Sequence, residues 1–170
     1  MSGRSWRTVD IVVAAAIGVA FGVVFWAWNT VWAAATPVFT FMPVAQNLIY
    51  GVWLIPAVLG GLVIRKAGAA LFTELVAASV SAFLGSQWGL DAIVSGLIQG
   101  GAAEILFAVF RYRSWTLAVA VLAAVATALG AWLHDVPLYY AELGYGGSVP
   151  ILIFMLVSAA IVAGVGSWYL

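Results

Sequence analysis

Two glutamates, Glu74 and Glu104, stand inside long apolar stretches, where a charge is costly unless it faces a polar interior or a wet cavity. Each follows or precedes a short basic break by a similar distance, so we expect the two carboxyls at matching depth. No Lys or Arg within the apolar stretches is close enough to pair with both. Such a carboxyl is either neutral, or satisfied by hydrogen bonds, or completed by a cationic ligand.

Four further side chains could complete a site around these glutamates. They are Tyr50, Trp53, Gln99 and Asp135. Carboxylates neutralise positive charge and accept hydrogen bonds from amino groups, while Tyr and Trp faces stack on rings or hold a cation. The residue types therefore predict a small acidic and aromatic cavity that suits a compact aromatic cation or amine.

Plainer interpretations stand beside this one. Glu74 and Glu104 could be neutral carboxyls bonded to backbone or to Gln99, and Trp53 could be a packing or lipid-facing residue. Asp91 is expected to be the N-cap of a helix, since Asp favours that position. Asp10, beside a basic residue, is expected as a charge at the inner membrane interface.

Catalytic and metal sites are poorly supported. His134 is the single histidine and the chain has no cysteine, so thiolate chemistry and His- or Cys-ligated metals lack their ligands. Neither a phosphate-binding Gly-rich Lys motif nor a G-x-S-x-G motif occurs. The net charge of zero gives no reason to expect a nucleic-acid partner. We expect no enzyme, no cofactor and no bound metal.

The composition is that of an integral membrane protein. Apolar residues make up 66% of the chain and charged residues 7%, and the mean hydropathy is +1.16. A spanning helix needs about 20 mainly apolar residues. Six such helices fit a single all-α membrane domain over residues 1–170, with the first kept as a helix rather than cleaved as a signal. Their expected ranges are 9–35, 44–64, 68–85, 90–110, 115–134 and 149–168.

The basic residues predict the orientation. All six fall in three polar breaks that would share one side of the membrane, and the intervening loops 36–43, 86–89 and 135–148 hold none. Cytoplasmic loops carry an excess of Lys and Arg. Both termini are therefore predicted to be cytoplasmic. The pairs are Arg4 and Arg7, Arg65 and Lys66, and Arg111 and Arg113.

Three stretches resemble a known family. They are Tyr50-Gly-Val-Trp53, then Ile64-Arg-Lys-Ala-Gly-Ala-Ala-Leu71 leading to Glu74, then Gly96-Leu-Ile-Gln99-Gly-Gly-Ala-Ala-Glu104. They resemble the YkoE-type substrate-binding (S) component of energy-coupling-factor transporters. His134-Asp135 and the Tyr-rich segment after it also fit, and the resemblance covers most of the chain.

The resemblance implies a multi-pass protein of the bacterial inner membrane that captures thiamine, or its hydroxymethylpyrimidine moiety, from outside. It implies three partners in the lipid bilayer: a transmembrane coupling (T) subunit and two ABC-type ATPase subunits. Small residues on the first helix contact the coupling subunit in this family, which here would be Ala16 and Ala20; spacing alone indicates only packing. The family's basic tail after the last helix is not present beyond Ser167-Trp-Tyr-Leu170.

Under this resemblance the roles divide by chemistry. Glu74 and Glu104 would serve the aminopyrimidine or the cationic charge, with Gln99 as a neighbouring hydrogen-bonding group. Tyr50 and Trp53 would stack on a ring. Asp135 would hold the thiazolium charge or the hydroxyethyl end. The order of the two rings in depth stays open, and so does the role of Glu104, because both glutamates lie toward the inner side.

Two other readings remain. A channel or proton-coupled carrier for a small aromatic amine could use Glu74 and Glu104 as proton relays. The segment 36–43, rich in Pro and Phe, could be a gate over the pocket or only a connector.

Overall fold

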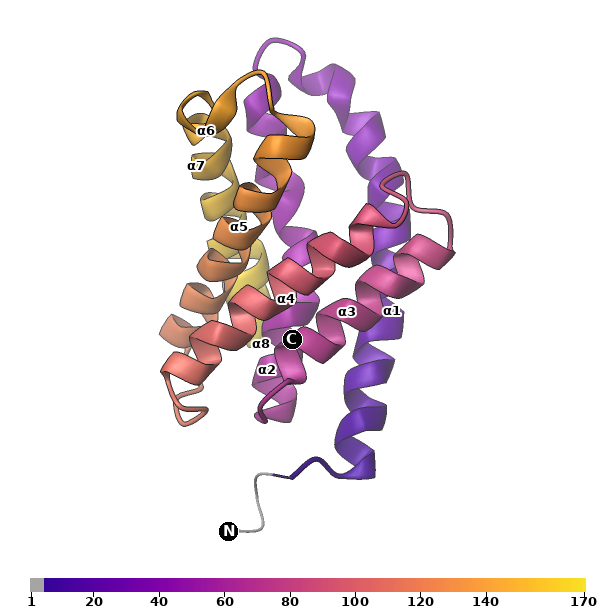
Figure 1. Ribbon diagram of the computed structural model, residues 1–170, viewed down its shortest axis with the longest axis vertical. Helices are drawn as coiled ribbons and strands as arrows, with labels where there is room; N and C mark the ends of the chain where they lie inside the picture. Colours follow the sequence, from indigo (N-terminus) through magenta and orange to yellow (C-terminus); the bar gives the residue numbers. More distant parts are fainter. Residues whose placement is uncertain (1–4) are drawn as a thin grey trace.

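The computed structural model describes residues 5–170, and every regular element in that range is helical, as predicted. Arg4 lies outside the described residues. Figure 1 shows the helices gathered in one bundle, with most of them along its long axis. In chain order the elements are α1 (Thr8–Ala35), η1 (Thr36–Phe39), η2 (Pro43–Leu54), α2 (Ile55–Ile64), α3 (Ala69–Phe83), α4 (Asp91–Val109), α5 (Leu117–Tyr139), α6 (Gly144–Gly147), α7 (Val149–Ser158), η3 (Ala159–Val165) and α8 (Gly166–Tyr169).

Five of the six predicted spans are long and apolar enough to cross a bilayer, and the third is shorter than expected. The long segments are Thr8–Phe39, Pro43–Ile64, Asp91–Val109, Leu117–Tyr139 and Val149–Tyr169, several of them built from consecutive elements. The third helix, Ala69–Phe83, has 15 residues, or about 22 Å at the α-helical rise. Figure 1 shows α3 running obliquely beside α4 rather than along the bundle axis.

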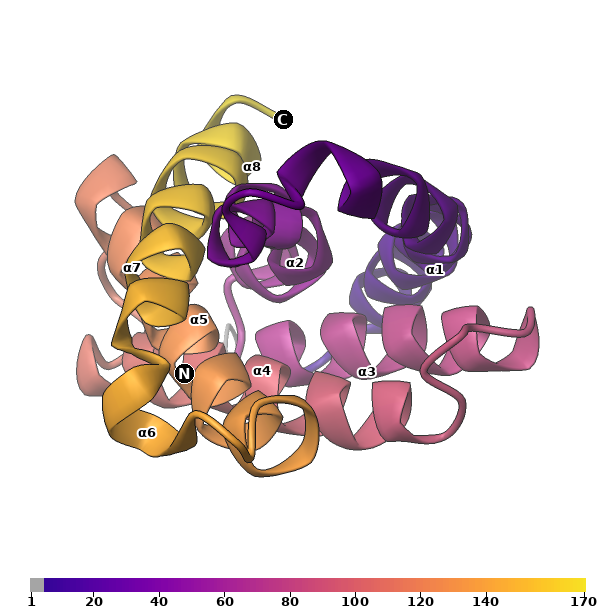
Figure 2. The same ribbon diagram turned by 90° about the horizontal axis from the view of Figure 1, so that it is seen from above.

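The second span is the core of the bundle. Figure 2 shows α2 in the middle, with α1, α3, α5 and α7 around it. Nearly every residue of α2 is buried, and the sequence IPAVLGGLVI is apolar throughout, as expected for a helix that is covered on all sides. The other long spans have large lipid-facing surfaces, so η2 and α2 form the scaffold on which the rest packs.

Helix α1 packs on α3 through a stripe of small residues. A Cβ atom on Gly18 would lie 2.7 Å from Val76, and one on Gly22 would lie 2.5 Å from Val80. Only glycine permits this approach, which is the usual role of small residues between membrane helices. Ala16 and Ala20 lie on the opposite, exposed face of α1.

Two non-α segments face one another across the bundle. η2 is a 12-residue 3-10 helix, far longer than the usual few residues, and η3 is a π-helix. They meet where Gly51 N donates to Ser158 Oγ at 2.8 Å and Ser158 Oγ donates to the carbonyl oxygen of Leu48 at 2.6 Å. A Cβ on Gly51 would lie 2.6 Å from the Ser158 carbonyl oxygen, so the contact requires glycine.

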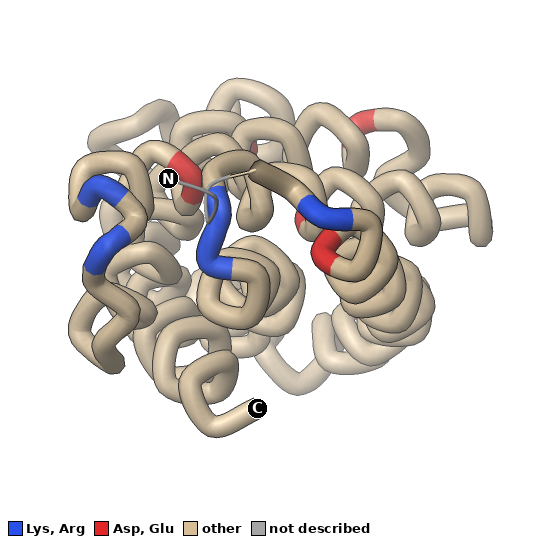
Figure 3. Tube along the Cα trace, turned by 90° about the horizontal axis from the view of Figure 1, so that it is seen from below, with Lys and Arg blue, Asp and Glu red and all other residues tan. Residues whose placement is uncertain are grey.

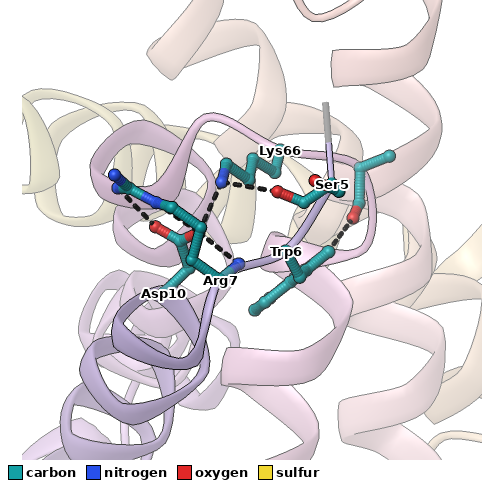
Figure 4. A network of polar contacts seen from close by, with 6 residues as sticks. Ser5, Trp6, Arg7, Asp10 and Lys66 are labelled. Atoms are coloured by element: carbon teal, nitrogen blue, oxygen red, sulfur yellow. Dashed lines mark hydrogen bonds and ion pairs between the residues drawn. The ribbon is translucent and has the colours of Figure 1, made fainter. Parts of the chain in front are cut away.

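The basic residues of the described chain gather at one end of the bundle, named here the basic end. Figure 3, seen from below, shows them in three groups near the viewer. At this end Lys66, from the loop between α2 and α3, pairs with Asp10 and donates to the Ser5 carbonyl oxygen at 2.8 Å (Figure 4). Arg7 closes on the same carboxylate, with Nη2 3.1 Å from Asp10 Oδ1. Asp10 is therefore an interface charge, as predicted.

Candidate functional site

A cavity of about 150 Å³ opens between the elements toward the end opposite the basic end. Residues of α1, η2, α3, α4 and α5 line it, and Tyr140 follows α5. Of the predicted site residues, five line it together: Tyr50, Trp53, Glu74, Gln99 and Asp135. Their convergence from four elements is the main structural result for the site.

The 3-10 helix η2 explains why Tyr50 and Trp53 share one face. A 3-10 helix has three residues per turn, so positions three apart eclipse one another. The two rings lie edge to face with centroids 5.3 Å apart, and both side chains are buried. In an α-helix the same spacing would separate them by about 60°.

Aromatic rings continue around the cavity from Trp53. Trp32 lies 5.0 Å from Trp53 between ring centroids, and Trp88 lies 6.4 Å from it. Tyr139 in turn lies 5.1 Å from Trp88 in an edge-to-face arrangement. Trp and Tyr faces arranged in this way can stack on a planar ring or hold a cation.

Glu74 lines the inner part of the cavity, and half of its carboxyl group is in use. Its Oε2 accepts a 2.8 Å hydrogen bond from the backbone N–H of Ala57, in the first turn of α2, where such amides lack a partner within the helix. Its Oε1 is buried and has no hydrogen-bond partner in the structure. A buried oxygen of this kind is costly to leave unpaired, so Glu74 presents an acceptor to a ligand.

A second acidic group lies nearer the cavity mouth. Asp135 Oδ2 accepts from the Tyr50 hydroxyl at 2.7 Å, and its Oδ1 lies 2.9 Å from His134 Nδ1. His134 Nε2 lies 3.2 Å from Asp91 Oδ1, and Asp91 Oδ2 accepts from the Tyr139 hydroxyl. One imidazole therefore stands between two carboxylates from two helices. The expectation that Asp91 caps α4 is wrong: it is the first residue of the helix and its side chain turns to His134 and Tyr139.

Amide and hydroxyl groups fill the spaces between these charges. Gln99 Nε2 donates to Ser95 Oγ at 2.7 Å and lies 3.4 Å from the Tyr50 hydroxyl. At the α1 side, Asn29 Nδ2 donates to Ser86 Oγ at 3.0 Å and accepts from Trp88 Nε1 at 3.2 Å. These bonds fix the rings and leave the wall polar without adding charge.

The structure places Glu104 away from the cavity. Its Oε1 accepts from Gly68 N at 2.6 Å and from the Tyr112 hydroxyl at 2.7 Å, and its Oε2 accepts from Ala70 N at 3.1 Å and from Leu71 N at 3.4 Å. It therefore caps the start of α3 from α4, which is a structural role. Burial, together with the bond to Glu104, raises the pKa of Tyr112 to about 12, so this hydroxyl remains a donor at neutral pH.

Four lining residues were given other roles, or none, by the sequence interpretation. Their side chains could be taken as interface markers because each lies near the end of a predicted helix. They are Trp32, Trp88, Asp91 and Tyr139. The available signal was that three predicted outer loops would bring them to the same side of the bundle. A shallower depression adjoins the cavity, lined by Trp32, Thr36, Pro37, Thr40, Gln87 and Trp88 among others.

Comparisons with known proteins agree with one another. A family model described as the permease component of an ABC-type cobalt transport system matches residues 9–130. YkoE of Bacillus subtilis (strain 168), which is named as an HMP/thiamine permease, is 33% identical over 162 residues, 95% of this chain and 80% of YkoE. A crystal structure of an S-component of an ECF transporter superposes with a TM-score of 0.90 at 32% identity, covering 97% of this chain and 83% of that one.

Proposed function

Because this chain belongs to the YkoE-type S components of energy-coupling-factor transporters, we propose that its cavity captures thiamine or the hydroxymethylpyrimidine moiety of thiamine. Membership makes it a non-enzymatic transport subunit and a multi-pass protein of the inner membrane. The name of the relative suggests the ligand, and the chemistry of the cavity supports that suggestion.

One observation carries the proposal: a buried, unpartnered oxygen of Glu74 lines a cavity whose other walls are aromatic rings and carboxylates. An aminopyrimidine offers an amino group for that oxygen and a flat ring for Tyr50 and Trp53. A thiazolium offers a positive charge for Asp135. Every charged side chain that lines the cavity is acidic, which favours a cation over an anionic vitamin.

The proposal extends to the transport partners. An S component works with a transmembrane coupling subunit, and two ABC-type ATPase subunits would supply the energy. The exposed face of α1 that carries Ala16 and Ala20 is available for the coupling subunit, because the packing of α1 on α3 uses Gly18 and Gly22 instead. The basic end would face the cytoplasm and the cavity would open outward.

Titration calorimetry of the detergent-purified chain tests the ligand. Thiamine and hydroxymethylpyrimidine should bind tightly, and riboflavin and Co²⁺, the latter included because of the family description, should not. A folded protein that binds neither of the first two would overturn the assignment. Uptake of an aromatic amine into liposomes without any ATPase subunit would instead favour a channel or proton-coupled carrier.

A further inference from the structure

The three carboxylates that line the cavity differ in how many of their oxygens are already bonded. On α3 the lining residues run inward from Ser81 through Ala78 to Glu74, so Glu74 forms the floor. On α4 they run from Asp91, the first residue of the helix, to Gln99, so Asp91 stands at the mouth. Eight residues of helix separate these two α4 positions, about 12 Å.

The mouth carries the group named here the carboxylate rim: Asp91, His134 and Asp135. All four of its carboxylate oxygens already have a protein partner, two of them tyrosine hydroxyls and two the nitrogens of His134. Such a group has little need of a further hydrogen-bond donor. It nevertheless has an excess of negative charge, because two carboxylates face one imidazole even when that imidazole carries its second proton.

The floor has the opposite character. Glu74 Oε1 has no partner, and the side chain is fully buried. Charge alone does not satisfy a buried acceptor; it needs an N–H or O–H group within hydrogen-bond distance.

Resting on the proposed function, we propose that the cavity contains two chemically distinct subsites: a donor-binding floor at Glu74 and a cation-binding subsite at the carboxylate rim. The rim takes a cation that has no hydrogen to donate, such as a quaternary nitrogen, and Trp88 and Tyr139 add ring faces beside Asp91. The floor takes an amino group. Thiamine therefore enters with its aminopyrimidine first and leaves its thiazolium at the mouth.

Two ligands and two variants separate the subsites. Thiamine has both an amino group and a quaternary nitrogen, whereas hydroxymethylpyrimidine has only the amino group. Asp91→Asn removes charge at the rim but keeps an acceptor for Tyr139. It should weaken thiamine binding by about tenfold or more and leave hydroxymethylpyrimidine binding unchanged. Asp135→Asn should give the same pattern and serves as the second rim variant if Asp91→Asn does not fold.

Glu74→Gln should weaken both ligands by the same factor, about tenfold or more. The amide has one carbonyl oxygen, which Ala57 N would occupy, so an NH2 group would then face the ligand's amino group. Equal loss of both ligands in the rim variants, or loss of thiamine alone in Glu74→Gln, would overturn the two-subsite assignment. Failure of the wild-type chain to bind either ligand would overturn the proposed function itself, and the melting temperature of each variant reports whether it is folded.

Discussion

The Glu104 carboxylate and the backbone N–H of Gly68 lie 2.6 Å apart, and this bond fastens the start of α3 to the inner half of α4. Glu74 does the same for α2 through Ala57, so both intramembrane glutamates cap a neighbouring helix. They differ in what is left over. Glu104 uses both oxygens on the protein, while Glu74 keeps one for the cavity.

Glu104→Ala should therefore lower stability and spare ligand binding. It removes the acceptor of three backbone amides, and we expect a loss of about 2 kcal/mol or more in unfolding free energy. Thermal unfolding in detergent measures the loss, and calorimetry on the folded fraction should give the wild-type affinity for thiamine. Glu104→Gln is the matched control, with a smaller loss of stability. Weakened binding in a stable Glu104→Gln protein would return Glu104 to the site.

The raised pKa of Tyr112 predicts a loss of stability at alkaline pH. An unfolded Tyr ionises near its ordinary value of about 10, whereas folded Tyr112 ionises near about 12. Between these values the unfolded chain loses its proton first, so this contribution to stability is complete below about pH 10 and is lost as the pH rises to about 12. Unfolding of wild type and Tyr112→Phe should be compared across this range. A Tyr112→Phe protein with the same pH dependence as wild type would contradict the assignment.

Trp53 should contribute to binding through its ring face. Trp53→Ala is expected to weaken thiamine binding by about 1–3 kcal/mol, whereas Trp53→Phe keeps a face and should retain much of the affinity. Calorimetry measures both. Unchanged affinity in Trp53→Ala would reduce Trp53 to a packing residue between Trp32 and Tyr50.

Gly51→Ala should reduce both stability and binding, because the new Cβ would lie 2.6 Å from the Ser158 carbonyl oxygen and displace η2 from η3. Tyr50 adjoins Gly51, so the displacement reaches the cavity wall. Gly101→Ala is the control: its Cβ would meet nothing within 4 Å, and Ala favours the helix by up to about 1 kcal/mol. Melting temperature and thiamine affinity should fall only in the first variant.

The predicted orientation can be tested by labelling, since the chain has no native cysteine. Thr116→Cys places an exposed thiol near the basic end, and Gln87→Cys and Glu142→Cys place exposed thiols near the opposite end. A membrane-impermeant maleimide added to intact spheroplasts should label the latter two and reach the first only after lysis. The reverse pattern would invert the topology.

The sequence predicted the helical class, the sorting of basic residues and five of the lining side chains, because each depends on residue type and order. It did not predict which glutamate is free. That depends on where two helix ends fall, since Ala57 and Gly68 become donors only because α2 and α3 begin beside them. Asp91 was misassigned for a similar reason: its partner His134 lies on another helix.

Helix type was equally hidden. Nothing in Pro43–Leu54 distinguishes a 3-10 helix from an α-helix by hydrophobic pattern, and only the contact of Gly51 with Ser158 shows why the tighter winding fits. The short α3 was also predicted too long, because apolar residues continue past Phe83 into the turn that follows.

The winding of η2 also sets where the cavity rings point. Each residue advances about 120° in a 3-10 helix and about 100° in an α-helix. If η2 rewound as a continuation of α2, a side chain would turn by about 20° for every residue of distance from Ile55. Tyr50 would turn by about 100° and Trp53 by about 40°, which would part the two rings and pull the Tyr50 hydroxyl away from Asp135. A change of pitch in one segment is thus sufficient to dismantle the pocket, with no movement of the surrounding helices.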